Sequence, residues 1–174
     1  MPTVPPRPTP ERVTDTYAIA RWKGLVLWVV DGQTPVSELE QLIELSKRHN
    51  ARYGDPRNVA LTIIHGTPSG MSAEERAAAA RLIESTKHTR VASSTVVLAR
   101  GLVAAVHRSI LTGISLLVPP PHPVKVCSDV PSALSFLQPH IESLCGPIAP
   151  DHIEAMASQL HDAVTERRLI RARD

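Results

Sequence analysis

The chain has 174 residues, of which 43% are hydrophobic, and this suffices for one globular domain with a core of its own. Its formal net charge of +2 excludes the strongly basic proteins that bind nucleic acids through clustered lysine and arginine. Two cysteines without metal-ligand spacing, no signal-peptide pattern and no apolar stretch of membrane-spanning length predict a cytoplasmic protein without stable membrane insertion.

The first predicted elements are a tail and a hairpin. Residues 1–14 are rich in proline, which removes backbone donors and favours extended conformations, so we expect a flexible tail. Residues 17–22 alternate between apolar and polar side chains, and Lys23-Gly24 supplies a tight turn. Residues 25–30 are continuously apolar, which predicts a strand buried on both faces in the middle of a sheet.

Two helices and a strand follow the hairpin. Thr34-Pro35 is a typical helix start, and the helix is expected to end at Gly54. Residues 59–64 form the third predicted strand. Ser72 and Glu75 then fit a capping box at the start of an alanine-rich helix.

The last part of the predicted domain continues the alternation. A strand at residues 91–98 leads into a long apolar helix from Leu102, and a proline-rich loop returns to a strand at residues 124–127. Ser128 or Asp129 caps the next helix.

This order predicts an α/β sandwich, β-β-α-β-α-β-α-β-α, built on a mostly parallel, mixed, five-stranded sheet over residues 15–138. Prolines and a glycine in residues 139–150 indicate a linker. Residues 151–174 are expected to form a separate amphipathic helix that packs on the domain or on a second copy of the chain.

The most specific pattern is the ending of the domain, where the helix of residues 104–113 precedes the strand and Ser/Asp cap of residues 123–130 and the A-L-S-F-L of residues 133–137. Together with the element order, it resembles the STAS-like bacterial domain family, which includes SEC14-like and anti-sigma-factor-antagonist-like proteins. The resemblance covers residues 16–138. It implies a regulatory domain that works through protein contacts and is phosphorylated on Ser or Thr after the third strand.

In this chain the corresponding loop holds Thr67, Ser69 and Ser72 as candidate phospho-acceptors and partner contacts. Only Ser69-Gly70 matches the Asp-Ser-Ser-Gly type of signature that the resemblance implies. A local interpretation stands beside it, in which Ser72 is a helix cap and the other two residues are ordinary turn residues.

Other polar residues form a second set of candidates. Arg100, His107 and Arg108 are a candidate anion-binding or partner patch, or else the exposed side of the apolar helix. His65 ends a strand at the edge where α/β sheets bind ligands, but no neighbour in sequence orients it, so we expect a solvated loop histidine.

The remaining histidines and the cysteines suggest no site. His152 and His161 lack the spacing of a metal pair. Cys127 is expected in the core, and Cys145 in the linker, where it would be reactive if exposed. We find no catalytic residues, metal site or cofactor motif in the pattern, and we predict a protein that is not an enzyme.

We therefore rank three hypotheses for the function. The first is a non-catalytic STAS-like regulatory module that binds an unidentified protein partner and also forms a homodimer. The second is a carrier of a small lipid or nucleotide, with an apolar cavity beside Gly113. An enzyme with an unrecognised site ranks last.

Overall fold

The computed structural model describes residues 9–52, 56–66, 72–99, 101, 105, 109 and 121–173. Within these residues, six strands form one mixed sheet in the order of the chain. The strands are β1 (Thr9–Val13), β2 (Tyr17–Trp22), β3 (Leu25–Val30), β4 (Asn58–Ile64), β5 (Arg90–Val97) and β6 (Val124–Cys127). The helices are α1 (Val36–Arg52), α2 (Ala73–Thr86), α4 (Val130–Cys145) and α5 (Pro150–Arg171). The predicted α/β class is confirmed.

The sheet changes direction after its first hairpins. β1, β2 and β3 pair antiparallel, whereas β3, β4, β5 and β6 run parallel. The β2–β3 turn is as short as predicted, and Lys23 adopts a positive φ of 50° in it. Parallel strands require long crossovers, and α1 supplies the one from β3 to β4 and α2 the one from β4 to β5.

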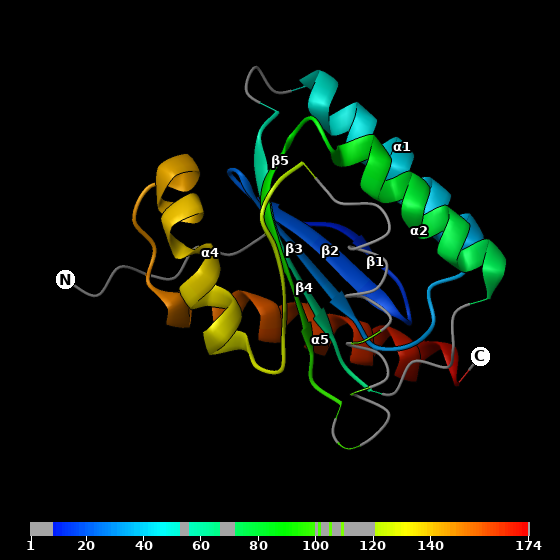
Figure 1. Ribbon diagram of the computed structural model, residues 1–174. Helices are drawn as coiled ribbons and strands as arrows, with labels where there is room; N and C mark the ends of the chain where they lie inside the picture. The colour runs from blue at the N-terminus through cyan, green and yellow to red at the C-terminus, as the bar shows by residue number, and fades with distance from the viewer. Residues whose placement is uncertain are drawn as a thin grey trace.

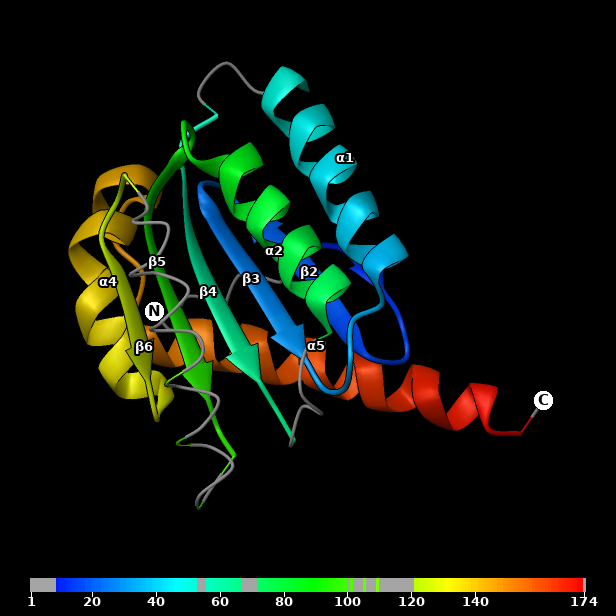
Figure 2. The same cartoon turned by 45° about the vertical axis from the view of Figure 1, so that its right-hand side comes forward.

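The helices cover the two faces of the sheet in pairs (Figures 1 and 2). α1 and α2 lie on one face, and α4 and α5 lie on the other. Because side chains alternate along a strand, β3 contributes Leu25, Leu27 and Val29 to the core under α4 and α5. Its Val30 belongs to a smaller core with Leu39 of α1.

The structure corrects two predictions: the flexible tail, of which residues 9–13 form a strand while residues 1–8 lie outside the described residues, and the five-stranded sheet. Thr9–Val13 forms a sixth strand that pairs with β2 at the edge of the sheet. Pro10 is tolerated because an edge strand has one side without ladder hydrogen bonds. Arg12 holds the strand through hydrogen bonds of 3.0 and 3.1 Å to the Glu38 carboxylate of α1.

The predicted linker at residues 139–150 is also wrong in its bounds. α4 continues through Pro139 to Cys145, and Gly146, with a φ of 80°, ends it. The proline removes one backbone hydrogen bond, but Ile141 and Cys145 beyond it are buried in the core, which favours continuing the helix. Cys145 is thus a core residue, and burial raises the pKa of its thiol.

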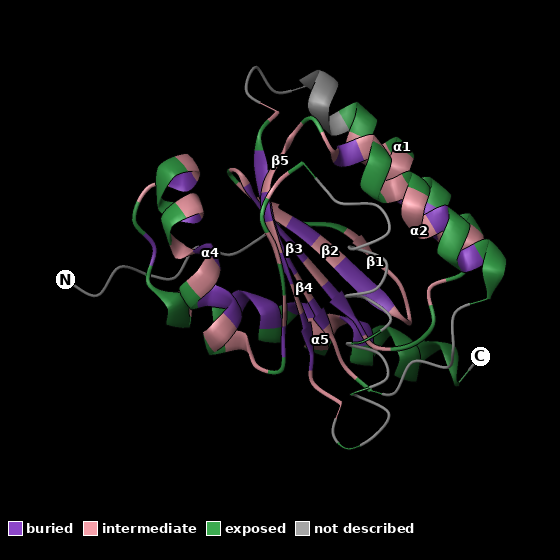
Figure 3. Cartoon of the chain, in the orientation of Figure 1, coloured by how far each residue is buried: buried purple, intermediate pink, exposed green. Residues whose placement is uncertain are grey.

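α5 packs on the domain, which is one of the two positions predicted for it, and its side chains are part of the main core. Its buried residues lie over the sheet, and they are Ile153, Met156, Ala157, Leu160 and Val164. Only its carboxyl end extends beyond the core, where Figure 3 shows exposed residues. No described helix combines the length and the apolarity that a membrane crossing needs.

Candidate functional site

Polar side chains gather at the carboxyl edge of β3 and β4, where α5 passes the sheet. Asp31 follows β3 and His65 follows β4, and the last residues of these two strands are register partners. His161 and Arg168 reach the same place from α5. The imidazole rings of His65 and His161 stack with their centroids 3.8 Å apart and an interplanar angle of 8°.

Asp31 is the centre of this edge cluster, which we define as Asp31, His65, His161 and Arg168. Its Oδ2 lies 2.9 Å from Arg168 Nη2 and 3.5 Å from His161 Nε2. Arg168 also donates through Nε to the carbonyl oxygen of Asp15, at 3.1 Å. The cluster therefore joins four parts of the chain: the β1–β2 turn, the ends of β3 and β4, and α5.

The electrostatics of the cluster keep one imidazole neutral. The pKa of His65 lies below its ordinary value, first because of burial and second because of repulsion by His161, while Asp31 acts in the opposite direction. Within the described residues, no three histidine, cysteine, aspartate or glutamate side chains are placed to hold a metal ion. The contacts present here position α5 on the sheet.

Beside the cluster lies a hollow of about 570 Å³ between the β1–β2 turn and the carboxyl end of α5. Three arginines line it, and two of them are paired. Arg12 binds Glu38, and Arg171 binds Asp15. Arg167 forms no ion pair with the described part of the chain. The lining residues are Arg12, Val13, Thr14, Asp15, Arg167 and Arg171.

The predicted phospho-acceptor loop is described only at Ser72, since Thr67 and Ser69 lie outside the described residues. Ser72 is the N-cap of α2 and forms the predicted capping box. Its Oγ accepts from Glu75 N at 3.1 Å, and Glu75 Oε2 accepts from Ser72 N at 2.6 Å. The Gln33 side-chain amide also donates to the Glu75 carboxylate. The hydrogen bond from the Ser72 backbone N–H, and next the one from Gln33, lower the pKa of Glu75. The cap interpretation of Ser72 is confirmed.

Ser72→Ala is expected to destabilise the domain by about 1 kcal/mol, because it removes an N-cap acceptor and one half of the box. Ser85→Ala on the same helix is the matched control, because the Ser85 hydroxyl binds the Leu82 carbonyl within the helix and caps nothing. Urea unfolding would measure the free energy of unfolding of both variants. Equal losses for the two variants would contradict a capping role.

Of the other predicted site residues, the structure describes His65 but not the arginine and histidine patch. The patch of Arg100, His107 and Arg108 lies outside the described residues. His65 is partly buried and stacks on the ring of His161, so the expectation of a solvated loop histidine is wrong. Sequence reasoning missed its partners Asp31 and His161. The available signals were an aspartate directly after a buried strand and the seven-residue spacing of His161 and Arg168, which places both on one helix face.

No protein-family model matches the chain, and no curated protein matches it at a significant level.

Proposed function

We propose that this chain is a non-catalytic, STAS-like regulatory module and that a partner protein docks at the hollow between the β1–β2 turn and α5. The observation that carries the proposal is an unpaired cation beside exposed apolar surface. Arg167, Ile170 and Arg171 are spaced i, i+3 and i+4 on α5, so they share one side of the helix. Ile170 is 50% exposed, so its apolar side chain is open to a partner beside the two arginines.

The charges around the hollow indicate the chemistry of the partner. Arg12 and Arg171 already have carboxylate partners, so Arg167 supplies uncompensated positive charge. An acidic side chain of the partner would satisfy it, and an apolar neighbour would cover Ile170. Such a mixed surface is typical of protein interfaces, in which arginine and apolar side chains are enriched at the centre.

The non-catalytic part of the proposal is supported by how the polar groups at the edge are used. Asp31, His161 and Arg168 bind one another, and the Ser72 hydroxyl binds a backbone amide. These contacts support structure and leave the hollow as a docking surface. Self-association stays a prediction.

Arg167→Glu is expected to weaken partner binding about tenfold or more, because it replaces attraction by repulsion at the docking surface. Arg48→Glu makes the same charge change at an exposed position on α1 and is the matched control. Each variant and the wild type would be immobilised in native extract, and retained proteins would be quantified by mass spectrometry.

The proposal requires one near-stoichiometric protein that the wild type and Arg48→Glu retain and that Arg167→Glu loses. Retention by all three proteins would contradict the docking site. Retention of a small molecule without any protein would contradict the regulatory module and favour the carrier.

A further inference from the structure

A second group of polar side chains lies at the opposite, amino end of the parallel strands. Val59 and Leu61 of β4 pack into the core under α4 and α5, so Asn58 faces the side of α1 and α2. On β5, the register partners Asn58–Arg90 and Val59–Ala92 leave Val91 as the extra residue of a β-bulge. Val91 and Ala92 both pack on the α4/α5 side, which directs Arg90 to the other face.

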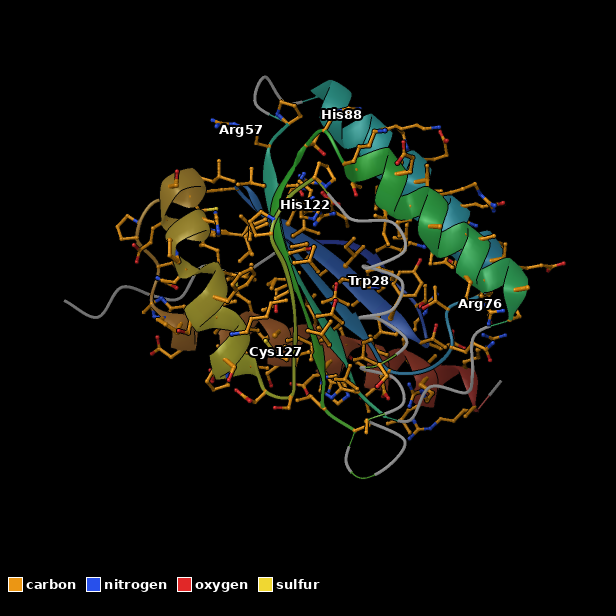
Figure 4. All side chains as sticks on the ribbon, viewed as in Figure 1. Trp28, Arg57, Arg76, His88, His122 and Cys127 are labelled. Carbon is orange, nitrogen blue, oxygen red and sulfur yellow. The ribbon has the colours of Figure 1, made fainter. Side chains whose placement is uncertain are left out.

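The neighbouring strand adds a histidine to this face. His122 precedes β6, and its Nε2 lies 3.1 Å from Ser93 Oγ. Ser93 is in register with Val124, and its backbone N–H donates to Pro123 O at 3.0 Å, which fixes His122 beside β5. Figure 4 shows His122 on the side of the sheet that faces α1 and α2.

Two donor positions in this group have no hydrogen-bond partner among the described residues. Arg90 Nη1 and His122 Nδ1 are both shielded from solvent and form no hydrogen bond with that part of the chain. The salt bridges of the described residues include none to Arg90. Buried charges in proteins are normally paired, and an orphaned buried donor calls for a bound ion or water.

The charged group that acts on Arg90 is a second arginine and not a carboxylate. Burial, and next the nearby guanidinium of Arg21, lower the pKa of Arg90 to about 10. Burial, and next Arg90, lower the pKa of His122 to about 4, so the imidazole is neutral near pH 7. Arg21 is itself largely buried, with 11% of its side chain exposed, and its Nε lies 3.8 Å from Glu11 Oε1, so Glu11 balances Arg21, whereas no salt bridge of the described residues balances Arg90. A site with these properties attracts an anion.

We propose that Arg90 and His122 bind an oxyanion, a phosphate or carboxylate group of a small ligand, on the α1/α2 face of the sheet. The planar guanidinium binds such groups with two parallel hydrogen bonds. With the proton of His122 on Nδ1, Nε2 accepts from Ser93 and Nδ1–H donates to the anion. The site lies at the other end of the sheet from the proposed docking hollow, so neither proposal depends on the other.

The test is an NMR titration of the histidine side chains in the full chain, prepared in buffer free of phosphate and carboxylate. Inorganic phosphate and acetate would be added separately. At least one of them is expected to shift the His122 resonances saturably, and the anion that saturates at lower concentration identifies the preferred group. If neither anion gives a saturable shift in the folded wild type, the proposal is wrong.

Arg90→Met removes the guanidinium and keeps a long apolar side chain, and it is expected to weaken anion binding roughly tenfold or more, since a charge-assisted contact is lost. Arg167→Met, at the other end of the sheet, is the matched control and should bind the anion as the wild type does. If Arg90→Met fails to fold, Arg90→Lys takes its place in the test, because it keeps the positive charge and removes the planar guanidinium that makes two parallel hydrogen bonds.

Thermal melts give a second readout that a merely structural arginine would not move. Without anion, Arg90→Met should melt at the same temperature as the wild type or higher, because a partly buried charge without a carboxylate partner is gone. With the anion, only the wild type and Arg167→Met should gain stability. Equal anion affinity in Arg90→Met and the wild type would overturn the assignment of Arg90.

Discussion

Deletion of residues 150–174 is expected to leave the protein without a cooperative unfolding transition. α5 covers β2 and β3, and five of its residues are buried against them. Each large core side chain that is truncated costs about 2–5 kcal/mol, while a whole domain is stable by only about 5–15 kcal/mol. The free energy lost with the whole helix is therefore larger than the free energy of unfolding of the domain. Far-UV circular dichroism during heating would show a gradual change in place of a sigmoidal one.

A matched pair of leucines on α5 tests the same point in the full chain. Leu160 is 1% exposed and Leu169 is 57% exposed. Leu160→Ala is expected to cost about 2–5 kcal/mol, whereas Leu169→Ala should change stability by less than about 0.5 kcal/mol. A stable truncated domain, or equal effects of the two substitutions, would show that the domain folds without α5.

Acidification is expected to produce the second large effect, beginning below the ordinary histidine pKa of about 6.5. Both His122 and His65 have a lowered pKa in the folded protein, mainly because of burial. The unfolded chain then binds protons that the folded chain does not, so stability falls as the pH falls. For His122 this loss continues down to its folded pKa of about 4. Because the ring is partly exposed, we expect its contribution to be about 1–2 kcal/mol.

His122→Gln isolates that contribution. The glutamine amide does not titrate in this range, so the variant should lose less stability than the wild type between about pH 7 and pH 5. His88→Gln, at an exposed position, is the control and should follow the wild type. Urea unfolding at the two pH values would measure the difference. Identical losses in all three proteins would mean that His122 does not drive the acid sensitivity.

The parts of the fold that depend on local sequence could be predicted. Continuous apolar residues identified β3 and β4, and the spacing of Ser72 and Glu75 identified the capping box. The prediction failed where distant contacts outweigh local preference. Pro10 and Pro139 both argue against regular structure, yet one lies in an edge strand and the other in a helix whose later residues are buried.

The candidate sites depend on distant contacts even more than the fold does. His65 could be placed at a sheet edge, but its stacking partner His161 comes from a helix whose position on the sheet the sequence left open. Likewise, Arg90 faces α1 and α2 because of a bulge at Val91, and a one-residue irregularity of this kind leaves no pattern in the sequence.

The position of α5 also affects the order in which the protein can fold during synthesis. β2 and β3 are made early, and the helix that covers their apolar side is made late. Until α5 leaves the ribosome, a continuous strip of Leu25, Leu27 and Val29 stays open to other chains. Such transient exposure favours aggregation and binding by chaperones. The nascent protein should therefore depend on chaperones more than its size suggests, and this dependence should end once α5 is in place.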